Sequence, residues 1–150
     1  MTSLALRLDC FATDAASKQA TAVFATTTSS RDVARVLVGI RGGYCRAVFE
    51  DLARSSPREL MEIVRENRAP ETRMTFAAEI LGRDVPTSSA ANALLGILQN
   101  HPSPLVREGA VLGLAHHLDR IGVRHSLRAA AEGDPSPGVK RAVAEVLDED

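Results

Sequence analysis

The sequence predicts an all-α protein, a short α-solenoid in which about four helical hairpins stack side by side. The main observation is an internal repeat, because HPSPLVREGAVLGL at 101–114 returns as DPSPGVKRAVAEVL at 134–147. Proline, serine and apolar positions recur at one offset of 33 (135 minus 102, 147 minus 114). A second observation is the composition, since 45% hydrophobic residues with only 3% aromatic ones suit one continuous core of Leu, Val and Ala. A fixed offset of this length is typical of stacked helical repeats.

The repeated stretch contains the signals that begin a helix. Pro102 keeps the chain extended, Ser103 can accept a hydrogen bond from the first turn, and Pro104 suits the first helical position, where no N–H is needed. Apolar residues then recur with helical spacing and form one broad face. They are Val106, Ala110, Val111, Leu114 and Leu118. We therefore predict that one helix begins at Pro104 and that its copy begins at Pro137.

A first hairpin is predicted over residues 30–54. Apolar residues with helical spacing lie on both sides of the pair Gly42 and Gly43, whose access to positive φ suits a tight turn between two helices. A Gly-Gly pair can also cradle phosphate, but only after a strand and within a longer glycine pattern. Both flanks here have helical spacing, so we expect a turn.

Three further hairpins are predicted from residue 56 to the C-terminus. The second begins at Ser56, where a first-turn proline and a following glutamate complete the start signal, and its partner helix contains TRMTFAAEILG. The third opens at Thr87 or Ser88 and continues into the repeated stretch. The fourth begins with a helix over 121–132 and ends with the copy. No long structureless loop is needed, as is usual for compact domains.

The pattern D-P-S-P-x-V-R/K followed by Ala or Val resembles the HEAT repeat, and occurs here as DPSPGVKRAV and HPSPLVREGA. The resemblance is clear over residues 85–150 and weaker over 31–84. It implies that each unit is a pair of antiparallel helices, that the repeated stretch opens the second helix, and that second helices line the concave face of a curved rod. Such a scaffold serves many purposes, so the motif predicts architecture better than function.

The N-terminal residues have no clear pattern, and we divide the chain into residues 1–29, an N-terminal cap or tail, and a HEAT-like repeat domain over 30–150. Alternation from Leu4 to Cys10 resembles a strand, whereas Ala15 to Ala25 could form a helix. Three interpretations stay open: a capping helix, a flexible tail, or a strand that docks on a partner's sheet edge. Capping is favoured because the terminal units of repeat arrays are usually atypical.

Charge and composition exclude several classes of function. The net charge is −1 and the pI is near 6.4, which lacks the basic excess of proteins that bind phosphate backbones, so we expect no nucleic-acid partner. Arg7 and Asp9 interrupt any signal-peptide core, and no apolar run is long enough to span a bilayer. We therefore expect a cytoplasmic protein without membrane contact, in which Cys10 and Cys45 are two free thiols.

One basic residue lies at an equivalent place in each second helix. These residues are Arg46, Arg73, Arg107 and Lys140. They could form a basic stripe for an acidic partner, but in HEAT proteins the residue at this place usually pairs with an acid in a neighbouring repeat's turn. Asp134 is where that acid is expected, so we favour a structural ladder. His101 takes the corresponding place in the preceding copy, which leaves the ladder incomplete.

No metal, cofactor or catalytic set is nominated by the spacing of reactive residues. His116 and His117 are adjacent, so on a helix they point about 100° apart and do not share one metal easily. Deoxyhypusine hydroxylase, a HEAT-repeat enzyme, uses His-Glu dipeptides, and none occurs here. HEAT-like DNA glycosylases rely on tryptophans in a basic groove, and this chain has no tryptophan. A bilin lyase stays a minor alternative, as does a self-assembling structural subunit.

The favoured function is a non-catalytic adaptor that binds another protein along its second helices. Positions outside the apolar seam form a column across the stack, with an apolar middle and charged ends, which suits an interface with a polar rim. The candidate partner-binding residues are Tyr44, Met74, Leu105, Glu108, Leu112 and Arg141. Alternatively, Leu105 and Leu112 pack against the preceding repeat. Self-association through the end repeats is a further possibility.

Overall fold

The computed structural model describes residues 45–148, and these form a stack of helical hairpins. Residues 45–55 are helical, and three hairpins follow. The helices of these hairpins are α4 (Pro57–Arg65) and α5 (Glu71–Asp84), α6 (Ser88–Asn100) and α7 (Pro104–Leu114), and α8 (Val123–Gly133) and α9 (Pro137–Asp148). The predicted helix over residues 30–40, the Gly42–Gly43 turn, Tyr44 and the N-terminal segment lie outside the described residues.

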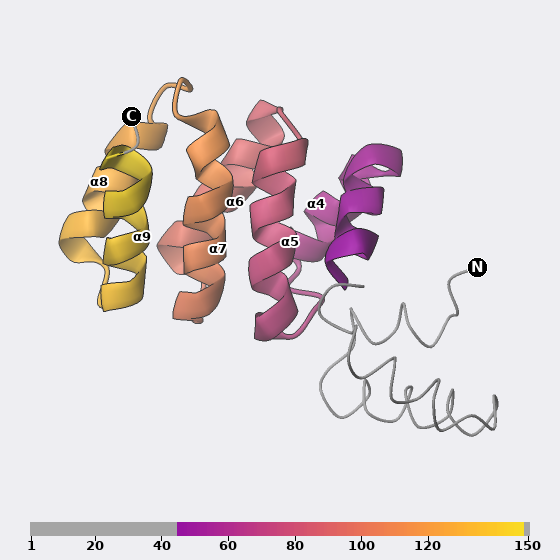
Figure 1. The fold of residues 1–150 in the computed structure, drawn as a ribbon, viewed down its shortest axis with the longest axis horizontal. Coiled ribbons are helices and arrows are strands. Elements are labelled where there is room, and N and C mark those ends of the chain that lie inside the picture. Colours follow the sequence, from indigo (N-terminus) through magenta and orange to yellow (C-terminus); the bar gives the residue numbers. More distant parts are fainter. Residues whose placement is uncertain (1–44, 149–150) are drawn as a thin grey trace.

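The helices are arranged in two layers. The first helices α4, α6 and α8 lie in one layer, and the second helices α5, α7 and α9 lie side by side in the other (Figure 1). Hairpin follows hairpin along the long axis of the described region, and no strand occurs among residues 45–148. The predicted short α-solenoid is confirmed.

Local signals in the sequence place the helix starts. Ser103 precedes α7 and its hydroxyl accepts a hydrogen bond from the Val106 N–H at 3.4 Å, and Ser136 accepts one from the Val139 N–H at the same distance. Thr87 caps α6 in the same way, through the Ala90 N–H at 3.2 Å. Ser56 begins α4 as expected but makes no side-chain capping bond, so only the start of that helix was correctly predicted.

The end of α7 differs from the prediction that one helix reaches Leu118. The α-helix ends at Leu114, and a 3-10 turn, η1 (Ala115–His117), follows it. The cause is visible in His117, which is buried and bonds through Nε2 to the Gly82 carbonyl of α5, at 2.9 Å. Tightening the last turn brings the imidazole inward, and Ile121 is left fully exposed in the connection to α8.

The core is continuous from one hairpin to the next. Buried Leu, Val, Ile and Ala side chains from every described helix form one cluster, with Phe49 and Met74 as its largest members near the N-terminal end. Each hairpin hides an apolar flank against its neighbour, as expected for a solenoid. The fold therefore leaves function to the outward-facing positions of the two layers.

Candidate functional site

The outer face of α7 exposes two large apolar side chains. Leu105 and Leu112 are 38% and 39% exposed, and Glu108 lies between them in sequence. Spacing of three and then four residues places all three on one side of the helix. Among residues 45–148 the only other large hydrophobic residue with comparable exposure is Ile121, in the α7–α8 connection. We call Leu105, Glu108 and Leu112 the α7 surface.

Glu108 connects the α7 surface to the start of α9. Its carboxylate lies against Gly138, where a Cβ atom would collide with Glu108 Oε1. Gly138 is the second residue of α9, and the positive end of a helix dipole favours a carboxylate at this place. Arg141 lies one turn further along α9 and is exposed. Glu108 is therefore half-buried between two repeats, and Arg141 flanks it.

Charged side chains join α5 to the helical residues 45–55. The guanidinium of Arg46 lies 5.0 Å from the centre of the Phe76 ring and 3.4 Å from Glu79. One turn further on, Arg83 donates to Glu50 at 2.7 Å. Hydrogen bonds to Asp84 and Glu50 raise the pKa of Arg83 further above its already high value. The second-helix layer thus has an apolar centre on α7 and polar borders on α5 and α9, the anatomy of a protein interface.

The structure corrects the predicted column at Met74. Met74 is completely buried, so the expectation that it contributes to an accessible surface is wrong. The reason is that α5 packs very closely against α7, and Met74 enters the core together with Ala77 and Ala78. Tyr44 lies outside the described residues. The four remaining candidates, Leu105, Glu108, Leu112 and Arg141, lie on adjacent helices.

Glycines allow α7 to approach α5 very closely, and this packing orients the α7 surface outward. Gly113 faces Gly82 so directly that a Cβ on Gly82 would overlap the Gly113 backbone, and Gly109 meets the backbone of Thr75 in the same way. The α5–α7 contact is the most extensive between described helices. The role of these glycines was not predicted from the sequence, although the spacing of four residues between Gly109 and Gly113 on α7 could have indicated it.

The predicted ladder is present at Arg107. Its Nε and Nη2 donate to the two carboxylate oxygens of Asp134 at 3.0 and 3.1 Å, and Nη1 donates to the His101 carbonyl at 2.8 Å. Burial alone raises the pKa of Asp134, but hydrogen bonds from Arg107 and from the Ser136 N–H outweigh burial, so this pKa is lowered. Arg107 is therefore occupied inside the stack and is not available to a partner.

His101 stands at the position that Asp134 has in the next repeat, and it performs one of the two roles of that aspartate. Its Nδ1 accepts from the Ser103 N–H at 3.0 Å, as Asp134 Oδ1 accepts from the Ser136 N–H at 2.9 Å. Because Nδ1 is an acceptor, Nε2 carries the proton and donates to Asn67 Oδ1 at 2.9 Å. Burial lowers the pKa of His101, and the charge of Arg107 lowers it further. A neutral imidazole thus acts as a turn acceptor.

His117 is also held neutral. Arg120 Nε donates to its Nδ1 at 2.9 Å, so Nε2 must carry the proton that reaches the Gly82 carbonyl. Burial lowers the pKa of His117, with a further contribution from the Arg120 charge. This histidine joins η1 to α5 and fixes the end of α7, which is a structural task.

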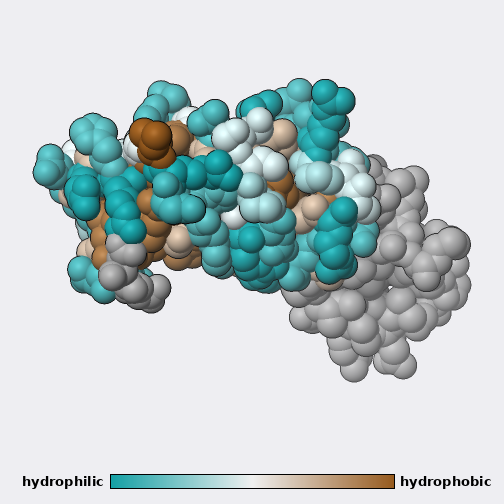
Figure 2. Space-filling view, turned by 90° about the horizontal axis from the view of Figure 1, so that it is seen from above, coloured by the Kyte–Doolittle hydropathy of each residue, from teal (hydrophilic) through white to brown (hydrophobic). Residues whose placement is uncertain are grey.

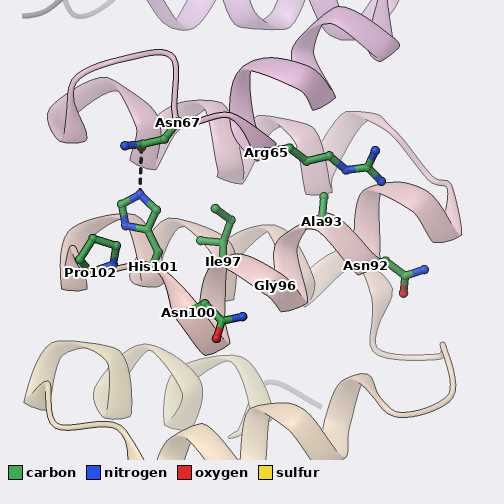
Figure 3. A pocket seen from close by; sticks show the side chains of 9 residues that line it. All are labelled: Arg65, Asn67, Asn92, Ala93, Gly96, Ile97, Asn100, His101 and Pro102. Atoms are coloured by element: carbon green, nitrogen blue, oxygen red, sulfur yellow. Dashed lines mark hydrogen bonds between the residues drawn. The ribbon is translucent and has the colours of Figure 1, made fainter.

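Two grooves lie between successive first helices, on the other layer. The first, of about 450 Å³, is lined by α4, α6 and the turns that follow them (Figure 3). The second, of about 270 Å³, lies one repeat further on, between α6 and α8. Within the described part of the chain, no group of three or more His, Cys, Asp or Glu side chains is arranged to hold a metal ion.

The C-terminal end of the stack presents mostly polar side chains. Lys140, Arg141 and Glu145 are exposed on α9, and hydrophilic side chains border an apolar area at this end in the view from above (Figure 2). Self-association through the end repeats stays a prediction. No helix among residues 45–148 has both the length and the apolar character needed to cross a bilayer.

Cys45 participates in a disulfide, so the expectation that it is a free thiol is wrong. Its partner lies outside the described residues. The cytoplasmic location stays a prediction.

Comparison with protein-family models matches residues 57–148, more than half of the chain, to a family described as HEAT repeats. No curated protein and no solved structure matches the chain.

Proposed function

The chain belongs to the HEAT-repeat family, and we propose that it is a non-catalytic adaptor that holds a protein partner on the α7 surface. HEAT repeats are commonly scaffolds for protein interactions, and a scaffold needs one accessible patch that differs from the rest of its surface. The observation that carries the proposal is the exposure of Leu105 and Leu112 on one side of α7. The exposed part of each leucine contributes no burial energy in the free chain, whereas a partner gains free energy by covering it.

The surroundings of the leucines support a partner of mixed chemistry. Glu108 lies between them in sequence and Arg141 lies on the next helix, so the patch has one negative and one positive charge beside its apolar centre. Full burial of a leucine contributes about 1.5–3 kcal/mol. Each leucine is already more than half covered, so about 1 kcal/mol per side chain is available for binding.

The experiment compares charge insertion at two places, with two glutamates on the α7 surface and one glutamate in the α7–α8 connection. The double variant Leu105→Glu with Leu112→Glu puts carboxylates into the proposed contact, and Ile121→Glu puts one on an exposed apolar position outside α7. Affinity capture of the tagged full chain from its native cell should lose its specific partners in the double variant and keep them in Ile121→Glu. Circular dichroism shows that both variants are folded. If a folded double variant recovers its partners undiminished, the α7 surface is not the interface.

A further inference from the structure

The groove between α4 and α6 has a small-residue floor with polar groups along its length. Ala93, Gly96 and Ile97 form the floor, and the side chains of Asn92 and Asn100 lie at its two ends along α6 (Figure 3). Asn92, Gly96 and Asn100 are spaced by four residues, so they share one face of the helix. The groove therefore offers carboxamides at each end and an open apolar position between them.

The side chains of the two asparagines on α6, Asn92 and Asn100, are available for hydrogen bonds with a ligand. Both are exposed, and neither side chain forms a hydrogen bond with another residue of the described region. A carboxamide offers two donors and one acceptor, which matches the N–H and C=O of a peptide backbone. Eight residues of helix separate them by about 12 Å. An extended peptide covers that distance in about four residues.

The two ends of the groove differ in charge. Arg65 extends toward the end at Asn92, while Asn67, His101 and Pro102 close the other end (Figure 3). Arg65 is exposed, and it has no ion pair within the described region. His101 is neutral because its Nδ1 accepts from the Ser103 N–H. Arg65 is thus the only charged residue lining the groove, and it favours a carboxylate at its end.

The middle of the groove has room for a side chain. A Cβ atom built on Gly96 would meet nothing within 4 Å, in contrast to the glycines between α5 and α7. Gly96 costs helix stability of about 1 kcal/mol relative to alanine. Packing between the helices does not require a glycine at position 96. Because Gly96 has no side chain, the groove stays open at this point.

The equivalent groove of the next repeat lacks these features. Gln99 occupies the place of Arg65, 34 positions on (99 minus 65), and Ala129 that of Gly96, 33 positions on (129 minus 96). Ser126 replaces Ala93 in the floor. The combination of a cationic end, paired amides and an open middle therefore belongs to the α4–α6 groove and not to the repeat in general.

We propose that the α4–α6 groove binds an extended peptide segment of a partner protein, with an acidic side chain at Arg65 and an apolar side chain over Gly96. The peptide backbone exchanges hydrogen bonds with Asn92 and Asn100. This site lies on the first-helix layer and goes beyond the proposed function, which uses the second-helix layer. An experiment can disprove binding at one of these two sites without bearing on the other.

The test uses a random dodecapeptide library displayed on phage, selected against the full chain. Enriched sequences should share an aspartate or glutamate at a fixed distance from an apolar residue. Synthetic peptides of these sequences are then measured by fluorescence anisotropy against variants. Gly96→Leu, which fills the groove with a good helix former, should weaken binding at least about tenfold. Ala129→Leu, the matched change one repeat on, should leave binding unchanged.

The charge contact is tested with a double-mutant cycle. Arg65→Gln should weaken binding of the acidic peptide about fivefold. A peptide with Gln or Asn at the acidic position should bind the native chain and the Arg65→Gln variant equally. A peptide whose only carboxylate is its C-terminus distinguishes a terminal from a side-chain contact, and it should bind more weakly. The proposal is overturned if no acidic motif is enriched, or if the selected peptides bind Gly96→Leu as tightly as the native chain. The proposal is also overturned if the selected peptides bind the folded Leu112→Glu variant more weakly than the native chain, because that result would place them on the α7 surface.

Discussion

The close approach of α5 and α7 makes Gly113→Ala a sharp test of the packing. A Cβ on Gly113 would lie 2.7 Å from the Ala78 carbonyl oxygen, 3.0 Å from Leu94 Cδ1 and 3.3 Å from Gly82 Cα. An ordinary contact between carbon and a carbonyl oxygen is about 3.3 Å, so the two helices must separate by about half an ångström. The nearest obstacle is backbone, which a rotamer change does not move.

Two opposing effects set the size of the change. Alanine gains about 1 kcal/mol over glycine in a helix interior. Overpacking against fixed backbone costs about 1–3 kcal/mol, and separation of the helices also loosens the core around Leu94. These two magnitudes leave a net loss of about 0–2 kcal/mol, to which the loosened core adds, so we expect about 1–2 kcal/mol, or about 2–8 °C in Tm for a chain of this size.

Gly96→Ala is the matched control, since it makes the same chemical change in a helix where the new Cβ meets nothing within 4 Å. It should raise stability by up to about 1 kcal/mol. Urea unfolding followed by circular dichroism at 222 nm measures both variants. The packing argument is refuted if Gly113→Ala is as stable as the native chain or more stable.

Two further predictions concern the polar groups inside the stack. Arg107→Met removes one partner of a buried ion pair and leaves the Asp134 carboxylate uncompensated. The free energy of unfolding, measured in urea, should therefore fall by about 3–5 kcal/mol. A fall of less than about 1 kcal/mol would contradict the role of the pair. The pKa values of His101 and His117 are lowered in the folded chain, so the unfolded chain binds protons more readily. The stability that these two neutral histidines contribute should therefore be fully present above the ordinary histidine pKa of about 6.5, and it should be lost as the pH falls below that value. His101→Asn keeps an acceptor for the Ser103 N–H and should flatten that profile between pH 7.5 and 5, and an unchanged slope would show that His101 does not cause it.

Helix boundaries were predictable wherever local chemistry decides them. Proline and a serine or threonine oxygen mark the starts of α6, α7 and α9, and a helix start depends on the few residues around it. The pairing of Arg107 with Asp134 was also predictable, because the repeat brings the same two positions together in each copy.

Details that depend on contacts between helices were not predictable in this way. Met74 has the same place in its helix as Glu108, yet one is buried and the other half-exposed, because α5 and α7 lie closer together than α7 and α9 do. The early end of α7 depends on the bond from His117 to Gly82, which joins residues 35 positions apart. The groove along α6 depends on how far α4 lies from it, and no periodicity in the sequence reports that distance.

The most direct test of the proposed adaptor role is site-specific photo-cross-linking in the native cell. The photoreactive residue p-benzoylphenylalanine replaces Leu112 in one version of the full chain and Ile121 in another, both at exposed apolar positions. We predict that light links the version altered at position 112 to a discrete protein, and that the version altered at 121 gives no such product. No product at 112, or the same product at both positions, would contradict the assignment of the α7 surface as the place where a partner binds.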